Sequence, residues 1–154
     1  MRAIHAWLFQ DLPHHQPGVT RGDTEHGWIK RRMLEDETFA YAVHYLHRDV
    51  AARIAVILKR FGGTGALFGR TPRAAARRFA VLYADLDHAH GFYEGNSRTL
   101  REFTRFLAEA AGFTLDRIGT GVGAGERNQL YLARYRGAGA RLSWADGAAG
   151  NGDR

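Results

Sequence analysis

The twelve residues from His90 to Arg101, HGFYEGNSRTLR, bring together side chains that could carry out chemistry on a nucleotide. A neutral histidine accepts a proton near pH 7, and a glutamate offers the oxygen ligand that Mg²⁺ prefers. The Gly-Asn-Ser turn stands where a loop meets the start of a helix, which is a natural anion site. These residue types predict a site for a nucleoside triphosphate and its magnesium, beside a base for an incoming hydroxyl.

His90 is the candidate base, Glu94 the candidate Mg²⁺ ligand, and Phe92 the side chain expected to anchor the loop in the core. Taken alone, a histidine is most often a surface or core residue with no role, and a loop glutamate is most often simply solvated. These assignments therefore depend on the whole segment and not on any single position.

Phosphate binding is expected from the second half of the segment. Gly95, Asn96 and Ser97 can expose successive backbone N–H groups, and the Asn96 side chain could add another donor. Arg98 and Arg101 are expected at the β- and γ-phosphates, since a guanidinium contacts phosphate in a bidentate manner. A solvated basic surface is the alternative for such a helix face. However, the helix dipole disfavours cations in a first turn by about 0.3–1 kcal/mol each, and a bound anion would remove that conflict.

Three helices are expected to position the segment. The first is predicted from Phe39 to Gly62, where apolar residues form one continuous stripe. The second is predicted from Thr71-Pro72 toward His90, and the third from Asn96 to Gly112. The stripe of the first consists of Val43, Leu46, Val50, Ile54, Ile57 and Phe61.

Weaker patterns cover the ends of the chain. A shorter helix is predicted over Met1 to Leu12, with Ile4, Leu8 and Leu12 inward, and the stretch from Pro13 to Glu37 is expected to be mainly loop. Residues 124–135 are expected to form a further helix with Leu130 and Ala133 inward. The tail over residues 146–154, rich in Gly and Ala, is expected to be disordered.

The segment resembles the signature of the Fic family, H-P-F-x-[D/E]-G-N-G-R-x-x-R. Two positions depart from it: Gly91 stands where proline is usual, and Ser97 stands where glycine, or lysine in Doc-type relatives, is usual. The opening segment from Ile4 to Phe9, IHAWLF, is similar to the I-H-x-x-L-F opening of Fic domains. The stretch from Phe106 to Asp116 is similar to the family's downstream helix and turn.

The resemblance implies an all-α, mainly helical Fic fold: a helical bundle around a central motif helix, with a small β-hairpin flap. It further implies a single domain over residues 1–145, with the flap near Trp28 to Leu34. The implied reaction is AMP transfer from ATP to a Ser, Thr or Tyr hydroxyl of a target protein, with Mg²⁺ as cofactor. His90 would be the base, Glu94 the Mg²⁺ ligand, and Asn96 with Arg98 the anion hole.

Alternatives stay open at this point. The same scaffold could transfer a phosphoryl or phosphocholine group, or it could be a degenerate domain that binds nucleotide or a partner without turnover. Ser97 could crowd the diphosphate, donate to it or cap the helix, and Gly91 loosens the loop entrance relative to proline.

Composition narrows the partners and the location. The net charge of +6 favours polyanions, but the basic residues are spread through every segment without interleaved aromatics, so nucleic acid is not favoured. The absence of cysteine agrees with a reducing, cytoplasmic compartment, and no segment predicts a signal peptide or a membrane span. The abundance of Ala, Gly and Arg suggests a GC-rich bacterial genome.

Regulation is a further expectation from the resemblance. The chain lacks the [S/T]-x-x-x-E-[G/N] inhibitory helix of many Fic proteins. Restraint is therefore expected from a separate antitoxin-like protein or from limited expression. The resemblance implies the toxin of a toxin–antitoxin pair or an effector, in which case secretion is an open alternative.

Overall fold

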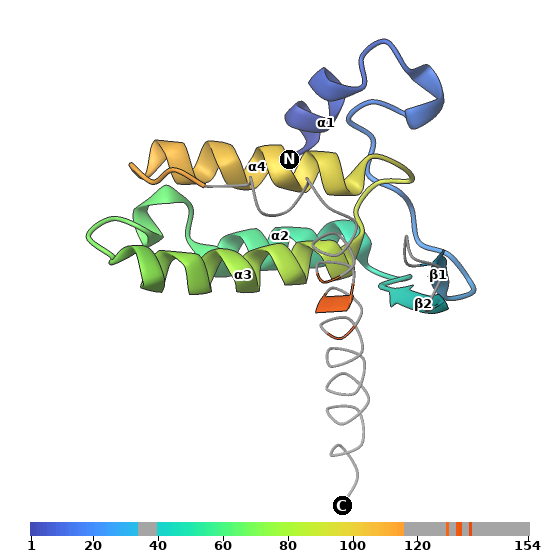
Figure 1. Cartoon of the computed structure of the whole chain (residues 1–154). Helices are drawn as coiled ribbons and strands as arrows, with labels where there is room; N and C mark the ends of the chain where they lie inside the picture. The colour runs from blue at the N-terminus through green and yellow to red at the C-terminus, as the bar shows by residue number, and fades with distance from the viewer. Residues whose placement is uncertain (34–39, 116–128, 130–131, 134–135, 137–154) are drawn as a thin grey trace, which may run out of the picture. The chain divides into compact units, whose positions relative to one another are not determined.

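The computed structural model describes residues 1–33, 40–115, 129, 132–133 and 136 of the 154-residue chain (Figure 1). The chain divides into two compact units, one of Met1–His26 with Leu46–Leu115 and one of Gly27–Tyr45 with Asp116–Arg154. The described part is mainly helical with a two-stranded sheet, as predicted. The expectation of a single domain over residues 1–145 stays a prediction, and the tail 146–154 lies outside the described residues.

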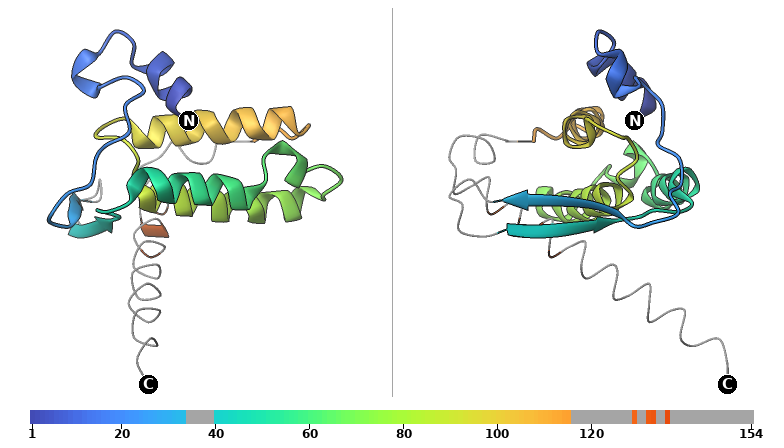
Figure 2. Two further views of the ribbon diagram at one scale, coloured as in Figure 1. Left: turned by 180° about the vertical axis from the view of Figure 1, so that it is seen from behind. Right: turned by 90° about the vertical axis from the view of Figure 1, so that its right-hand side faces the viewer.

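The first unit is helical. It contains α1 (Arg2–Leu8), the 3₁₀ turns η1 (Pro13–His15) and η2 (Thr64–Ala66), and the three longer helices α2 (Val50–Phe61), α3 (Pro72–Ala89) and α4 (Asn96–Ala110). The three longer helices run back and forth, each antiparallel to the next, and α1 lies against the beginning of α4 (Figures 1 and 2). This arrangement brings the end of α3 and the start of α4 to the same end of the bundle.

The main hydrophobic core lies among these three helices and η2. Its fully buried side chains are Ile57, Phe61, Leu67, Ala75, Phe79, Leu82, Leu86, Ala89, Leu100 and Ala108. Burial of a large apolar side chain contributes about 1.5–3 kcal/mol relative to exposure. The core therefore fixes the two helices that flank the motif loop.

Local signals explain α3 and α4, and both predictions are confirmed. Thr71 precedes α3 and its hydroxyl accepts a hydrogen bond from the N–H of Ala74 (3.3 Å), while Pro72 occupies the first helical position. Helix α4 begins at Asn96 and ends at Ala110, just before Gly112, which has a φ of 80°.

The helix predicted from Phe39 is wrong in its first half. Ala40–Tyr45 forms strand β2, and α2 begins only at Val50. The segment AYAVHY contains β-branched and aromatic residues, and antiparallel pairing with β1 (Trp28–Met33) overrides the helical spacing. Asp49 has a φ of 54°, which separates strand from helix.

The hairpin belongs to the second unit, and its first strand lies where a hairpin was predicted; its role as a flap stays a prediction. Trp28 pairs with Tyr45 and Met33 with Ala40, while Leu34 lies outside the described residues. Val43 and Tyr45 are buried and form a small cluster with Trp28 and Leu132.

The terminal predictions hold only in part. Helix α1 ends at Leu8 instead of Leu12, and Leu12 is exposed, because Pro13 disfavours a helical conformation at the residue before it. Leu132 and Ala133 are helical; Ala133 is exposed and not inward as predicted, while Leu130 lies outside the described residues. Within the described residues, no helix is both long and apolar enough to cross a membrane.

Candidate functional site

The motif forms a short loop between two helices, as predicted. Helix α3 ends at Ala89, and His90 follows it with a φ of 46°, an uncommon backbone conformation for a residue with a side chain. Gly95, with a φ of 74°, precedes the first residue of α4. The loop between α3 and α4 therefore reverses the chain within six residues.

The N-terminal segment packs directly against this loop. His5 is fully buried, and its ring stacks on that of Phe92 with centroids 3.9 Å apart. Phe92 is itself buried, as predicted for an anchor. The two segments that carry the family resemblance, far apart in sequence, thus form one packed unit.

Hydrogen bonds determine which nitrogen of His5 carries the proton. Nδ1 accepts from the backbone N–H of Gly18 (2.9 Å), so Nε2 carries the hydrogen and donates to the carbonyl of Glu94 (3.1 Å). Burial lowers the pKa of His5; the bond to Glu94 opposes this, and nearby His15 and Arg98 lower it further. His5 is therefore a neutral positioning side chain that holds the loop at Glu94.

Phe9 fills the space in front of Gly95. A Cβ atom at position 95 would lie 2.3 Å from Cε2 and 2.4 Å from Cζ of the Phe9 ring, far inside contact distance. The guanidinium of Arg98 lies over the Phe9 ring, 4.5 Å from the ring centroid. Glycine is thus required at 95 both by its backbone conformation and by its neighbour.

Asn96 uses its side chain within the loop. Its Oδ1 accepts from the N–H of Phe92 (2.9 Å) and its Nδ2 donates to the carbonyl of Phe92 (2.6 Å). The side chain is buried and uses one of its two N–H donors within the loop; donation to a phosphate stays a prediction. Asn96 closes the loop and fixes where α4 begins.

The start of α4 has features that an anion site would require, although anion binding there stays a prediction. No side chain caps this helix, and its first turn contains no acidic residue. Ser97 is half-buried, and both Arg98 and Arg101 are exposed on the first two turns. Two cations at the positive end of a helix dipole favour an anion there.

His90 lies at the end of α3, but its side chain is buried, with an exposed fraction of 3%. A base that accepts a proton from a protein hydroxyl must come within hydrogen-bonding distance of it. His90 therefore directly follows α3, but its imidazole is not accessible to a protein hydroxyl in this conformation.

Glu94 is an exposed residue of the loop. No group of three or more metal-ligating side chains occurs in the part of the chain that the structure describes. Magnesium on a nucleotide does not require such a group, because it takes one or two carboxylates together with phosphate oxygens and water. A single exposed carboxylate next to an uncapped helix fits this donor set.

Arg21 is a site residue that the sequence did not reveal. It is 1% exposed, and its guanidinium donates to the carbonyls of His90 (2.6 Å), Ala89 (3.1 Å) and Leu46. The backbone N–H of Arg21 donates to the carbonyl of Gly91 (2.9 Å). Burial lowers the pKa of this guanidinium, yet arginine stays protonated in proteins. The cation satisfies the carbonyls at the C-terminal end of α3, where the helix dipole favours it.

The segment after Arg21 ties further parts of the first unit together. Asp23 accepts a hydrogen bond from the N–H of Val50 at the start of α2 (3.3 Å), and Thr24 donates its N–H to the carbonyl of His47 (2.8 Å). Hydrogen bonds from the backbone of Asp49 and Val50 lower the pKa of Asp23. No periodicity or motif marks this segment, so only its tertiary contacts identify it.

Gly91, the departure from the family's proline, is buried against α2. A Cβ atom there would lie 2.5 Å from Cδ1 of Ile54. Ile54 therefore occupies the space that a side chain at position 91 would need.

A comparison with known protein-family models found none that matches this chain, and a search of curated proteins found no match either.

Proposed function

We propose that this protein is a Fic-type protein adenylyltransferase, which transfers AMP from ATP to a Ser, Thr or Tyr hydroxyl of a target protein. The observation that carries the proposal is the packing of two distant motif segments on each other. His5 stacks on Phe92, and Phe9 lies against Gly95. Two sequence motifs that serve one function are expected to contact each other in the folded protein, and these two segments do.

In the proposed reaction, the target hydroxyl oxygen forms a bond to the α-phosphorus of ATP. The bond from that phosphorus to the oxygen bridging to the β-phosphate breaks, and pyrophosphate leaves with the electron pair. The hydroxyl proton passes to a ring nitrogen of His90. A positioned base of this kind contributes about 10²–10⁴-fold to the rate.

The polyphosphate would lie at the start of α4. Backbone N–H groups of the first turn would donate to it, and Arg98 and Arg101 would balance its charge from the exposed side. Glu94 would hold Mg²⁺, which neutralises phosphate charge when bound. The dipole of α4 and its arginines then both favour the same ligand.

Burial of His90 favours a second candidate, a domain that binds nucleotide or a partner without turnover. The two candidates differ in one physical step. For catalysis the His90 ring must become accessible when the substrates bind, whereas binding alone requires no such change.

The experiment uses ATP labelled at the α- or the γ-phosphate with bacterial lysate proteins as acceptors. AMP transfer predicts α-label on an acceptor, its loss in His90→Ala, and its retention in His26→Ala, which removes an exposed histidine outside the motif. The γ-label on an acceptor would instead indicate phosphoryl transfer. Binding of Mg·ATP with no label from either position, equally in wild type and His90→Ala, would favour the second candidate.

The proposed partners follow from the proposed reaction. They are ATP with Mg²⁺, a target protein with an acceptor hydroxyl, and a separate antitoxin-like inhibitor if the protein is the toxin of a pair. A bacterial cytoplasmic location fits this role, and an effector role would require secretion.

A further inference from the structure

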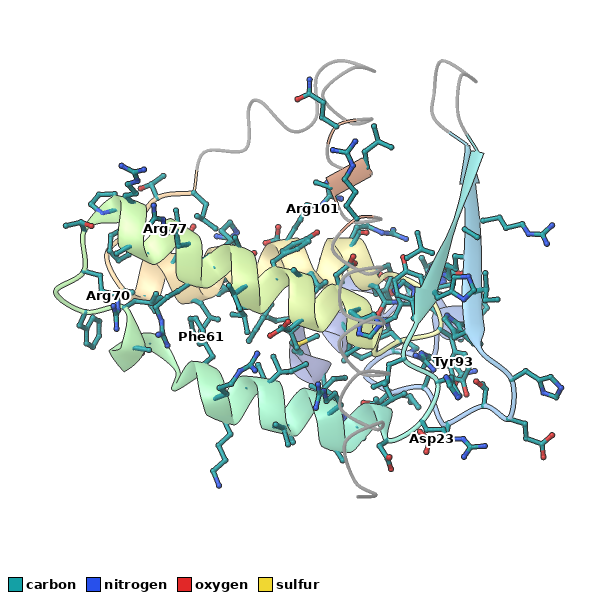
Figure 3. All side chains as sticks on the ribbon, turned by 90° about the horizontal axis from the view of Figure 1, so that it is seen from below. Asp23, Phe61, Arg70, Arg77, Tyr93 and Arg101 are labelled. Carbon is teal, nitrogen blue, oxygen red and sulfur yellow. The ribbon has the colours of Figure 1, made fainter. Side chains whose placement is uncertain are left out.

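A groove between α2 and α3 lies away from the motif loop. Its volume is about 370 Å³, and its apolar floor consists of Ile57, Phe61, Val81 and Leu82. Figure 3 shows Phe61 and Arg77 toward one end of the helices and Tyr93 of the motif loop at the other. The groove is therefore distinct from the candidate nucleotide site.

The rim of the groove is basic. Arg60, Arg77 and Arg78 line it, together with one carboxylate, Asp85, which forms an ion pair with Arg60. Arg78 donates to the carbonyl of Phe61 (2.9 Å), so it also holds the end of α2. Arg77 is exposed and has no ion-pair partner among the described residues.

The surrounding sequence strengthens this charge. Between Asp49 and Asp85 the chain contains seven basic residues and no acidic one. Although basic residues occur throughout the protein, acidic residues are missing from this whole stretch, which contains α2 and the first three turns of α3. Basic residues therefore outnumber acidic ones around the groove, where Asp85 is the one carboxylate among the lining residues.

We propose that this groove binds an acidic, amphipathic helix of a partner protein. Helices dock into apolar grooves through side chains three and four residues apart. The residues that line the groove follow the same spacing. Ile57 and Phe61 are four residues apart on α2, and Arg77 and Val81 are four residues apart on α3. Val81 is 54% exposed, so an apolar side chain of the partner would cover it while acidic residues pair with Arg77.

Charge complementarity separates this partner from other occupants. A second copy of the chain has a net charge of +6, and residues 116–154 of this chain contain six arginines and four acidic residues, so neither complements a basic rim. Single-stranded nucleic acid stacks on exposed aromatic side chains, whereas Phe61, the aromatic residue in the floor, is 7% exposed. A flat membrane surface would leave the hollow unfilled.

The test uses a synthetic helical peptide of glutamate, alanine and leucine, about five turns long, with leucine on one face. Binding is measured by fluorescence anisotropy, and its place is mapped by amide chemical shifts of the protein. The expected shifts cluster at Ile57, Phe61 and Val81. Arg77→Glu and Val81→Asp are each expected to weaken binding about tenfold or more.

Matched controls distinguish binding in the groove from nonspecific attraction between opposite charges. Arg31→Glu makes the same charge change at an exposed position on β1 and should leave the affinity within about twofold. A peptide of the same composition with scrambled leucines should bind at least about tenfold more weakly. Circular dichroism checks that each variant is folded, and Arg77→Gln replaces Arg77→Glu if the latter is not.

Three results would overturn the proposal: equal binding of the scrambled peptide, shifts confined to the motif loop, or unchanged affinity in both groove variants. Tighter binding of single-stranded RNA or of anionic phospholipid vesicles to this same face would also overturn it. His90→Ala should leave peptide affinity unchanged, so this outcome is independent of the proposed AMP transfer.

Discussion

Replacement of Gly95 by alanine tests how the N-terminal segment shapes the motif loop. The new methyl group would meet the edge of the Phe9 ring at 2.3 Å. That ring is held on both sides, because His5 lies 4.8 Å and His15 4.9 Å away between centroids. The ring therefore cannot move aside without disturbing its neighbours.

Gly112→Ala is the matched control. Gly112 has a φ of 80°, close to the 74° of Gly95, but a Cβ atom at 112 would have no neighbour within 4 Å. The left-handed conformation costs alanine about 1–2 kcal/mol, and the less flexible unfolded chain returns about 0.4–1 kcal/mol. We therefore expect Gly112→Ala to lower the free energy of unfolding by about 1 kcal/mol.

Gly95→Ala carries the same backbone term and the clash with Phe9 in addition. Overpacking in a filled site costs about 1–3 kcal/mol, so the expected loss is about 2–4 kcal/mol. Urea unfolding followed by far-UV circular dichroism measures both variants, and equal m-values would allow a direct comparison. The Phe9→Leu background, which removes the ring edge, should recover at least about 1 kcal/mol of the Gly95→Ala loss.

The reasoning is refuted if Gly95→Ala and Gly112→Ala agree within about 0.5 kcal/mol. Additivity of Gly95→Ala and Phe9→Leu would contradict it equally. Calorimetric titration with Mg·ATP adds a functional measurement, in which Gly95→Ala is expected to weaken binding and Gly112→Ala is not.

Three further predictions concern the groups around the loop. Arg21→Met should lower the free energy of unfolding by about 3–5 kcal/mol in urea, because it leaves several buried carbonyls without their donors; a loss below about 1 kcal/mol would contradict the capping role. Gly91→Ala should destabilise by about 1 kcal/mol or more and should be tolerated in the Ile54→Val background, which lacks the clashing Cδ1; equal effects in both backgrounds would exclude that contact as the cause. Because burial lowers the pKa of His5 from 6.5, the unfolded chain binds its proton first, so stability should fall as the pH drops below about 6.5. His5→Gln should show a shallower fall between pH 7.5 and 5 in urea titrations, and an unchanged slope would refute the assignment.

Local signals were sufficient wherever an element depends on its own neighbours. Thr71 and Pro72 marked the start of α3, and Gly112 marked the end of α4. These features act within one or two turns of a helix, so spacing alone reveals them.

The segment before α2 failed the same approach. Val43 and Leu46 continue the helical spacing of Val50, yet Ala40–Tyr45 is a strand. Pairing with Trp28–Met33 decides the conformation, and the spacing of apolar residues within one segment carries no information about that partner.

In the candidate site, too, some features follow from local sequence and others depend on tertiary contacts. The amino-acid sequence by itself indicated the loop between two helices, the start of α4 at Asn96 and the helix face with Arg98 and Arg101. It could not show that the amide of Asn96 closes the loop, nor that the imidazole of His90 is covered. Those outcomes depend on which groups surround each side chain after folding.

Only the tertiary structure brought Arg21 to the end of α3 and His5 to Glu94, across separations of 69 and 89 residues. A buried donor must find an acceptor, and the core decides which carbonyl lies within reach. Spacing along the chain therefore indicated the chemistry of this protein, whereas packing of distant segments decided its geometry.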